Sequence, residues 1–316
     1  MLKFYRVVIL ITLGAVWPFL SFTGQAETLR FAWPDGASAK VHARSEGRRV
    51  KTSGEKLAWD MSCDFTMSVR RTGDRVVVSS NDFSDWKGTL PPNIGGGAER
   101  FIDMIPTFIV SEGGAFLGIE GHETARKLMT ISAEQSGGLD PMTRKLFGVV
   151  SSNASLEAIA NDHWSVLVVQ WLDVELDPDT SSKILNVTSL PQLGGGEVEI
   201  IGTVKFVKET PCASGPANWR CVHLHAETGA DKMQVSKILQ SLLRQMRVNV
   251  PTVTALDLQF KVDIVVDKAT MLPQQLTINR LHTINLRMQG RDDGVLEEIT
   301  KNYTFAWRLP NGERKR

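Results

Sequence analysis

The stretch "LAWDMSCDFTMSV", Leu57 to Val69, constrains the fold more than any other, because apolar and polar residues alternate strictly along it. Every odd position is apolar, and the even positions from Asp60 to Ser68 are polar. Successive side chains of a β-strand point to opposite faces, so this pattern predicts a long strand with one buried and one wet face. Such strands are typical of antiparallel sheets. The buried face would carry Trp59, Met61, Cys63, Phe65 and Met67.

The C-terminal third repeats this alternation. In "LDLQFKVDIVV" the apolar residues from Leu256 to Ile264 share one face, Phe260 among them. The turn-like "VDKATMLPQQ" leads to a second strand, Leu276 to Met288, and "RDDG" leads to a third strand that ends in "NYTFAW". Further candidate strands lie at 28–33, 39–43, 75–80 and 197–208. Consecutive strands of this kind predict an antiparallel meander rather than alternating βαβ units.

Helical spacing of apolar residues predicts helices at 98–109, 139–150, 153–171 and 231–246. Asp140 and Pro141 are a typical helix start, as N-cap and first helical residue. We therefore predict an α+β fold in which a long curved antiparallel sheet, an unclosed barrel, packs on helices. A single domain would span residues 27–316, with a helical segment at about 98–171.

The first 26 residues predict a secretory signal peptide. Lys3 and Arg6 precede an apolar run from Val7 to about Leu20, and small residues lead up to Ala26, after which we expect cleavage. An uncleaved membrane anchor is the alternative, but the run is short for a spanning helix of about 20 residues. No other segment is apolar enough to cross a membrane. We expect an exported protein, periplasmic or secreted, that is not integral to the membrane after cleavage.

The charge balance argues against nucleic acid as a partner. Cleavage would remove Lys3 and Arg6 from the 36 basic residues and none of the 35 acidic ones, leaving a net charge of about −1. Nucleic-acid binding needs a basic field to offset the phosphates, and only the short tail "NGERKR" is basic. The same balance argues against a strongly anionic membrane surface.

Three cysteines are present. An exported protein meets an oxidising environment, where a cysteine pair is first interpreted as a disulfide. Cys212 and Cys221 flank the loop-like "ASGPANWR", and we predict that they are bonded to each other. Cys63 lies on the predicted buried face, where a free thiol behaves as a small hydrophobe. A reactive thiol is the alternative for that residue.

The segment "RCVHLHAETG" raises the question of a metal site. Alternation places Cys221, His223 and His225 on one face of a strand, opposite Val222 and Leu224. Zinc would need a third or fourth ligand, and a disulfide would remove Cys221 as a thiolate. The sequence also contains no HExxH motif and no paired CxxC. We predict a solvated strand face, no metal and no cofactor.

The segment "INRLHTINL" breaks the alternation. Strict period two places Arg280 and His282 on the same buried face as Ile278 and Ile284. Buried charge is costly unless it is paired, so two interpretations remain. A bulge can turn Leu281 inward instead. Otherwise Arg280 anchors an anionic head group inside an apolar cavity, and Lys301 can join it.

The turn contains the pattern V-D-x-x-T-x-x-P at Val266, Asp267, Thr270 and Pro273. Together with the export signal and the long strands with apolar inner faces, it resembles the lipoprotein-carrier family of bacterial periplasmic proteins. In that family an unclosed β-barrel wraps helices around an apolar cavity. The resemblance covers mainly residues 198–307, and no functional residue of the family can be carried over. It implies a carrier of a lipid-like ligand.

Our leading hypothesis is an exported, non-enzymatic protein that binds a lipid-like or other apolar small molecule. The predicted ligand-binding residues are Trp59, Met61, Phe65, Met67, Phe260, Arg280, His282, Ile284, Lys301 and Trp307. The apolar ones suit an adaptable pocket, although each can equally pack as ordinary core. One alternative is an envelope scaffold that binds an unidentified protein through a sheet edge. Another is a hydrolase that uses His122 and Glu123.

Overall fold

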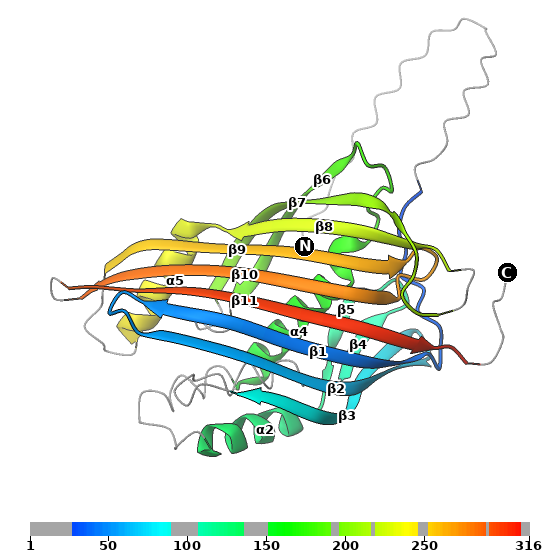
Figure 1. Ribbon diagram of the computed structural model, residues 1–316, viewed down its shortest axis with the longest axis horizontal. Coiled ribbons are helices and arrows are strands. Elements are labelled where there is room, and N and C mark those ends of the chain that lie inside the picture. The colour runs from blue at the N-terminus through cyan, green and yellow to red at the C-terminus, as the bar shows by residue number, and fades with distance from the viewer. Residues whose placement is uncertain are drawn as a thin grey trace, which may run out of the picture.

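The computed structural model describes residues 27–89, 107–135, 151–190, 196–215, 219–245, 252–288 and 291–310. Within these ranges, eleven strands form one antiparallel sheet in the order β5-β4-β3-β2-β1-β11-β10-β9-β8-β7-β6 (Figure 1). The first five strands along the chain are β1 (Ser38–Lys51), β2 (Lys56–Thr72), β3 (Arg75–Thr89), β4 (Thr107–Ser111) and β5 (Phe116–Glu120). The other six are β6 (Ser181–Leu190), β7 (Gly196–Thr210), β8 (Cys221–Ala230), β9 (Thr252–Asp267), β10 (Pro273–Met288) and β11 (Arg291–Arg308).

The sheet is a meander whose two halves meet at the first and last strands. Strands β1 and β11 pair along their whole shared length, from Ser38 opposite Arg308 to Lys51 opposite Val295. All other neighbours in the sheet are consecutive in the chain. The outermost described strands are therefore β5 and β6, and they come from the middle of the sequence.

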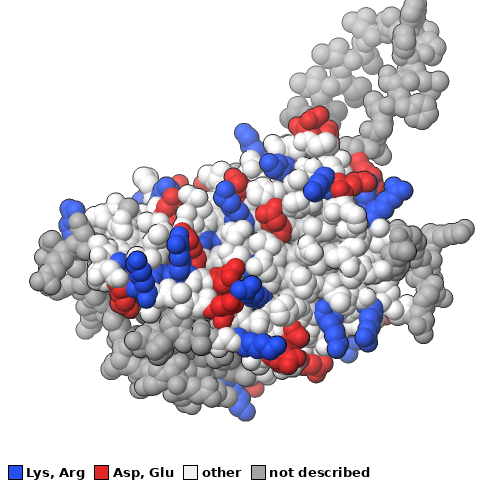
Figure 2. Space-filling model, viewed as in Figure 1, with Lys and Arg blue, Asp and Glu red and all other residues white. Residues whose placement is uncertain are grey.

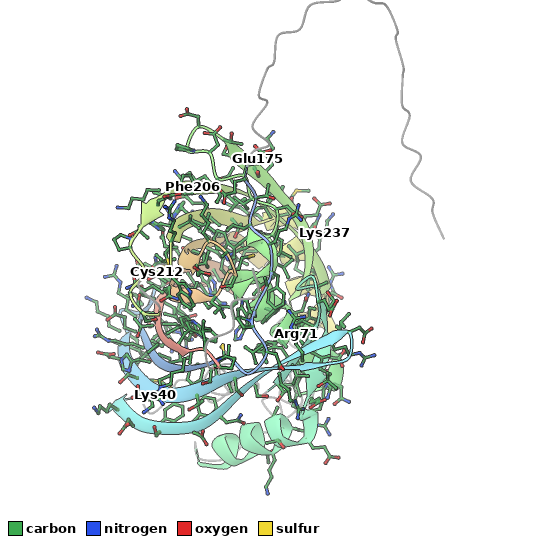
Figure 3. The ribbon with its side chains drawn as sticks, turned by 90° about the vertical axis from the view of Figure 1, so that its right-hand side faces the viewer. Lys40, Arg71, Glu175, Phe206, Cys212 and Lys237 are labelled. Carbon is green, nitrogen blue, oxygen red and sulfur yellow. A yellow bond between two sulfur atoms is a disulfide. The ribbon has the colours of Figure 1, made fainter. Side chains whose placement is uncertain are left out.

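The predicted alternation is confirmed. On β2 the side chains of Trp59, Cys63, Phe65, Met67 and Val69 are buried. We call the side of the sheet that carries them the inner face and the opposite side the outer face. Seen along the strands, the sheet curves around its inner face, whereas Lys40 on β1 points outward (Figure 3).

Three α-helices are described: α2 (His122–Gln135), α4 (Asn153–Leu167) and α5 (Lys232–Gln245), together with a short 3₁₀ turn at Val169–Trp171. The N-cap of α4 is Ser152, whose hydroxyl accepts a hydrogen bond from the backbone N–H of Ser155. Helix α4 contacts both β5 and β6, the two outermost described strands, and α5 contacts β7 and β9. Helix α4 therefore spans the region between the two edges of the curved sheet.

The predicted α+β class is wrong, because a single sheet of eleven strands dominates the described chain. In the segment expected to be helical, Thr107–Ser111 and Phe116–Glu120 are strands. The first of these follows Pro106 in sequence and is rich in β-branched residues, which favour extended backbone. The expected helix at 139–150 and the predicted signal peptide at 1–26 lie outside the described residues.

The predicted disulfide is confirmed: Cys212 and Cys221 are bonded, with their Cα atoms 5.1 Å apart. Cys63 is buried and is a thiol, not part of a disulfide. At the β9–β10 turn, the Asp267 carboxylate accepts hydrogen bonds from the backbone N–H and the hydroxyl of Thr270, at 3.0 and 2.7 Å. These contacts fix the turn that precedes Pro273.

Candidate ligand-binding site

The inner face of β1 carries small side chains. Its inward positions are Ala39, Val41, Ala43, Ser45 and Gly47, which leave space between the larger residues of β2 and β11. A side chain at position 47 cannot be accommodated, because a β-carbon there would overlap the indole of Trp59. Gly47 thus makes room for Trp59, whereas the small Ala43 and Ser45 leave space on the inner face and line a cavity there.

A larger cavity, of about 80 Å³, lies on the inner face and is lined by residues of the strands on both sides of β1. Its walls from the sheet are Phe65, Met67, Ser80, Leu276, Ile278, Tyr303 and Phe305, with Phe108 from β4. Helix α4 closes it with His163, Val166 and Leu167. Two cationic residues, Arg280 and Lys301, also line it. The cavity is thus largely apolar with a local concentration of positive charge.

A second cavity of about 30 Å³ adjoins the first. Both are lined by Phe65 and Tyr303, and the second is further lined by Met61, Cys63, Phe83 and Trp86. An aromatic stack leads outward from it. Phe65 stacks on Phe83 with ring centroids 5.1 Å apart, and Phe83 stacks on Trp86 at 6.4 Å. Trp86 is 39% exposed, so the stack connects the cavity wall with the molecular surface.

Irregular pairing of β3 aims these aromatics inward. The register between β2 and β3 shifts on both sides of Asp64, and Asp82 and Asp85 adopt left-handed backbone conformations with φ of 57° and 52°. Such bulges re-aim side chains, so Phe83 and Trp86 can share one side although they are three positions apart. Aspartate tolerates the left-handed region better than most residues do.

Strand β10 resolves the two interpretations of "INRLHTINL". Its pairing with β9 runs without a shift from Gln275 to Asn285, and its pairing with β11 is continuous. The bulge that would turn Leu281 inward is therefore absent from this described strand. Arg280 and His282 lie on the inner face, with side chains 15% and 25% exposed.

Arg280 is held by few contacts. Its guanidinium lies 5.6 Å from the centre of the Phe260 ring, a cation–π distance. Its Nη2 is 3.9 Å from Asp162 Oδ2, which is too long for a hydrogen bond. Its Nε is buried and has no hydrogen-bond partner among the described residues. A buried N–H without a partner is costly, which makes this edge of the guanidinium a natural anion receptor.

Asp162 and Lys301 complete the charged group beside the cavity. Lys301 lies on β11 opposite Ile278 and is 5% exposed. Asp162 reaches from α4, and its side chain keeps 45% exposure at the edge of the enclosed space. Burial raises the pKa of Asp162, and the positive charges of Arg280 and Lys301 oppose that rise. The surrounding protein thus partly desolvates the Asp162 carboxylate, which keeps some contact with solvent.

Two residues further along β10, a second polar row crosses the inner face. His282 Nδ1 lies 3.8 Å from Glu297 Oε2, and Arg49 Nε donates to Glu297 Oε1 at 2.8 Å. Glu297 is 12% exposed. His282 thus neighbours an ion pair, whereas Arg280 and Lys301 line the cavity.

The structure brings some of the predicted binding residues together and separates others. Phe65, Met67, Arg280 and Lys301 line the larger cavity, and Met61 lines the smaller one. Phe260 lines neither of these two cavities and packs against Arg280, and Trp59 packs over Gly47. Ile284 belongs to a separate apolar cluster with Val198, Val235 and Leu256. Trp307 lies in an aromatic core with Trp33, at 5.6 Å between ring centroids.

Sequence reasoning missed the contribution of α4. Asp162 and His163 are consecutive polar residues on a helix that otherwise carries an apolar face. No pattern in the sequence of this helix shows that it packs near Arg280. Tyr303, Phe305, Leu276 and Ile278 were identifiable as inward positions of their strands, though not as cavity walls.

The histidine pair of β8 lies away from the cavity. His223 Nε2 and His225 Nδ1 both contact Asp263 Oδ1, at 2.9 and 3.0 Å. Partial burial opposes the effect, but the hydrogen bonds from His225 and His223 lower the pKa of Asp263. In the part of the chain that the structure describes, no group of three or more His, Cys, Asp or Glu residues is placed to hold a metal ion.

His122, considered as a catalytic residue, opens α2, and its Nε2 lies 3.1 Å from Glu157 Oε1 on α4. The contact links the two helices, and neither residue lines the larger or the smaller cavity. None of the described helices is long and apolar enough to cross a membrane.

No protein-family model matches the chain, and no curated protein matches it either. Three solved structures are similar to it in outline, each at 8% identity. The structure titled "Lipid-protein interactions in lipovitellin" has a TM-score of 0.37, covering 89% of this chain and 26% of that one. DynF from the dynemicin biosynthesis pathway of Micromonospora chersina has a TM-score of 0.22, covering 94% and 95%. OccK5 (OpdH) of Pseudomonas aeruginosa has a TM-score of 0.21, covering 87% and 99%.

The chain thus spans about a quarter of the length of the lipovitellin chain. At these TM-scores the similarities carry no argument about function, and no member of the lipoprotein-carrier family is among the three.

Proposed function

We propose that this is an exported protein that binds a lipid-like ligand on the inner face of its sheet. The apolar part of the ligand would lie against Phe65, Met67 and Phe305, and an anionic head would lie beside Arg280 and Lys301. The observation that carries the proposal is a single cavity that combines apolar walls with two cations. Pockets that are mostly apolar with a few convergent polar groups are typical of ligand sites.

The volume of the larger cavity favours a ligand with a single acyl chain. A group the size of a water molecule needs about 10–15 Å³ by the same measure, so about 80 Å³ holds roughly six such groups. That volume fits part of one acyl chain and not a whole diacyl lipid. The smaller, adjoining cavity extends the space for a ligand toward β3. Strand β3 lies four strands away from β10, which is about 19 Å across the strands of the sheet.

Export is the second part of the proposal. The Cys212–Cys221 disulfide is typical of proteins that mature in an oxidising environment, and the sequence of residues 1–26 predicts the signal that would bring the chain there. The scaffold alternative would use an open sheet edge. It receives less support, because α4 contacts both outermost described strands.

A cavity-filling substitution tests binding directly. Ser80 is 6% exposed and lines the larger cavity, so Ser80→Phe would place a ring in the space that the ligand needs. We expect Ser80→Phe to weaken binding of dodecanesulfonate, a single-chain anionic probe, at least tenfold in isothermal titration calorimetry. Ser79→Phe, at the next position of β3 and not lining either cavity, is the matched control and should bind as the wild type does. Equal binding by both variants, or none by the wild type, would contradict the proposal.

A further inference from the structure

The arginines of the outer face show how a guanidinium is satisfied in this sheet. Arg44 donates from Nε and Nη2 to the two carboxylate oxygens of Asp60, at 2.9 and 2.7 Å. Arg48 uses the same two nitrogens on Glu298, at 2.6 and 2.9 Å. Each pair is a side-on fork, the geometry in which arginine binds carboxylates and other oxyanions most specifically.

Arg280 presents the same edge to the inner face, but the fork is incomplete. Asp162 approaches Nη2 only to 3.9 Å, and Nε has no hydrogen-bond partner in the described structure. Arg280 lines the cavity and is 15% exposed, so a missing bond is more costly here than on the outer face. Asp162 supplies countercharge to Arg280 without satisfying its donors.

The position of Asp162 on α4 explains why the fork stays open. Helix α4 is anchored by buried residues such as Trp164, whose Nε1 donates to the carbonyl of Gly114 at 2.7 Å. An anchored helix keeps the short aspartate side chain at its distance from β10. An incoming anion on a flexible ligand has no such restraint at Nη2, and a rotation of the guanidinium would bring the buried Nε to it as well.

We infer that Asp162 is an internal competitor for the anion subsite of Arg280, and that a ligand with a compact oxyanion head must displace its negative charge. The inference rests on the proposed function and narrows it to single-chain amphiphiles with a carboxylate-like or sulfonate-like head. Asp162 then sets the affinity: while it is ionised it repels a second anion at Arg280, and when it is neutral that repulsion is absent.

The charges around Asp162 define the expected pH dependence. Arg280 faces it from β10 and Lys301 from β11, and His163 adjoins it on α4. His282 and Glu297 occupy the neighbouring row. Because burial raises the pKa of Asp162, it protonates at a higher pH than an ordinary aspartate. An anionic ligand raises that pKa further, so binding takes up protons and affinity increases as the pH falls.

The test compares three variants with three probes that share one chain length. Asp162→Asn, Glu157→Gln and Arg280→Met are titrated with dodecanesulfonate, dodecyltrimethylammonium and dodecanol. We expect Asp162→Asn to bind dodecanesulfonate about tenfold more tightly than the wild type at pH 7, because a nearby like charge is removed. Glu157→Gln lies on the same helix but faces His122, and it should not change affinity. Dodecanol should bind Asp162→Asn and wild type alike.

The possible results distinguish the competitor role of Asp162 from the proposed binding function. Unchanged or weaker dodecanesulfonate binding by Asp162→Asn would overturn the competitor role and leave the binding function in place. No binding of any probe by the wild type would overturn both. If Asp162→Asn does not fold, the pH profile of His163→Gln decides, because the His163 imidazole also lines the cavity and histidines gain charge as the pH falls. Dodecanesulfonate stays ionised, so tighter binding by this variant toward low pH supports the inference, and a flat profile overturns it.

Discussion

The two faces of the central strands differ in how their charged side chains are paired. On the outer face, lysines and arginines alternate with acidic residues, and neither sign forms a separate patch (Figure 2). Pairs such as Arg44–Asp60 and Arg48–Glu298 are complete hydrogen-bonded forks in water. On the inner face, apolar side chains surround a small charged group in which Arg280 lacks a partner at Nε.

Stability alone does not explain why the two faces pair their charges differently. Exposed ion pairs contribute little, because water and salt screen them. A buried charge with an open donor is expensive, and an apolar residue at the same position is often as stable. Stability therefore gives Arg280 no evident reason to lie beside an apolar cavity, and a few polar groups in a mostly apolar pocket are typical of a ligand site.

The largest expected effect concerns the helix that covers the inner face. Trp164 is fully buried and packs against Trp33 and Phe108, with centroid distances of 5.5 and 5.4 Å. Trp164→Ala should lower the free energy of unfolding by about 3–5 kcal/mol in urea titrations, because it leaves a large void.

The matched control for this prediction is Trp86→Ala. Trp86 is 39% exposed and stacks on Phe83, so its loss should cost only about 1 kcal/mol. If the two substitutions cost the same, α4 does not hold the inner face together as described.

An intermediate effect separates function from stability at Arg280. Arg280→Met removes the open N–H donor and keeps an unbranched side chain. Unfolding free energy should change by no more than about 1 kcal/mol, because the ion pair with Asp162 is long and Asp162 keeps both solvent and Lys301. Affinity for dodecanesulfonate should fall at least thirtyfold, as measured by calorimetry. A large loss of stability with unchanged affinity would make Arg280 a structural residue.

The smallest effect is expected on the outer face. Hydrogen bonding to Arg48 holds the pKa of Glu298 below its usual range. In Arg48→Met that pKa should rise toward the ordinary value, visible in an NMR titration of the Glu298 carboxyl carbon. Dodecanesulfonate affinity should not change. A loss of affinity in this variant would show that an arginine of the outer face contributes to ligand binding, which contradicts the difference proposed between the two faces.

Period-two alternation made the inner faces of the long strands predictable, because it is a local signal. It placed Phe65 and Met67 on the correct side of β2, but it left Arg280 open between an inward position and a bulge that turns Leu281 inward. The pairing of β1 with β11 could not be predicted, since registers between distant segments depend on the whole packed sheet. For the same reason the approach of Asp162 to Arg280 left no sign in the sequence.

The helices were less predictable than the strands. The apolar residues near 98–109 fit a helical spacing, but the described part from Thr107 is strand β4, where pairing with β3 decides the conformation. Helix α2 was not predicted: its first two residues, His122 and Glu123, were considered only as candidate catalytic residues. Short segments with mixed signals are settled by tertiary contacts.

The most direct test of a ligand on the inner face is native mass spectrometry of the full chain, purified after export by its own cells and without detergent. Ser80→Phe serves as the control. We expect an added mass of lipid size on the wild-type protein that disappears under organic denaturation and is absent from Ser80→Phe. A bare wild-type mass, or the same adduct on both proteins, would contradict it.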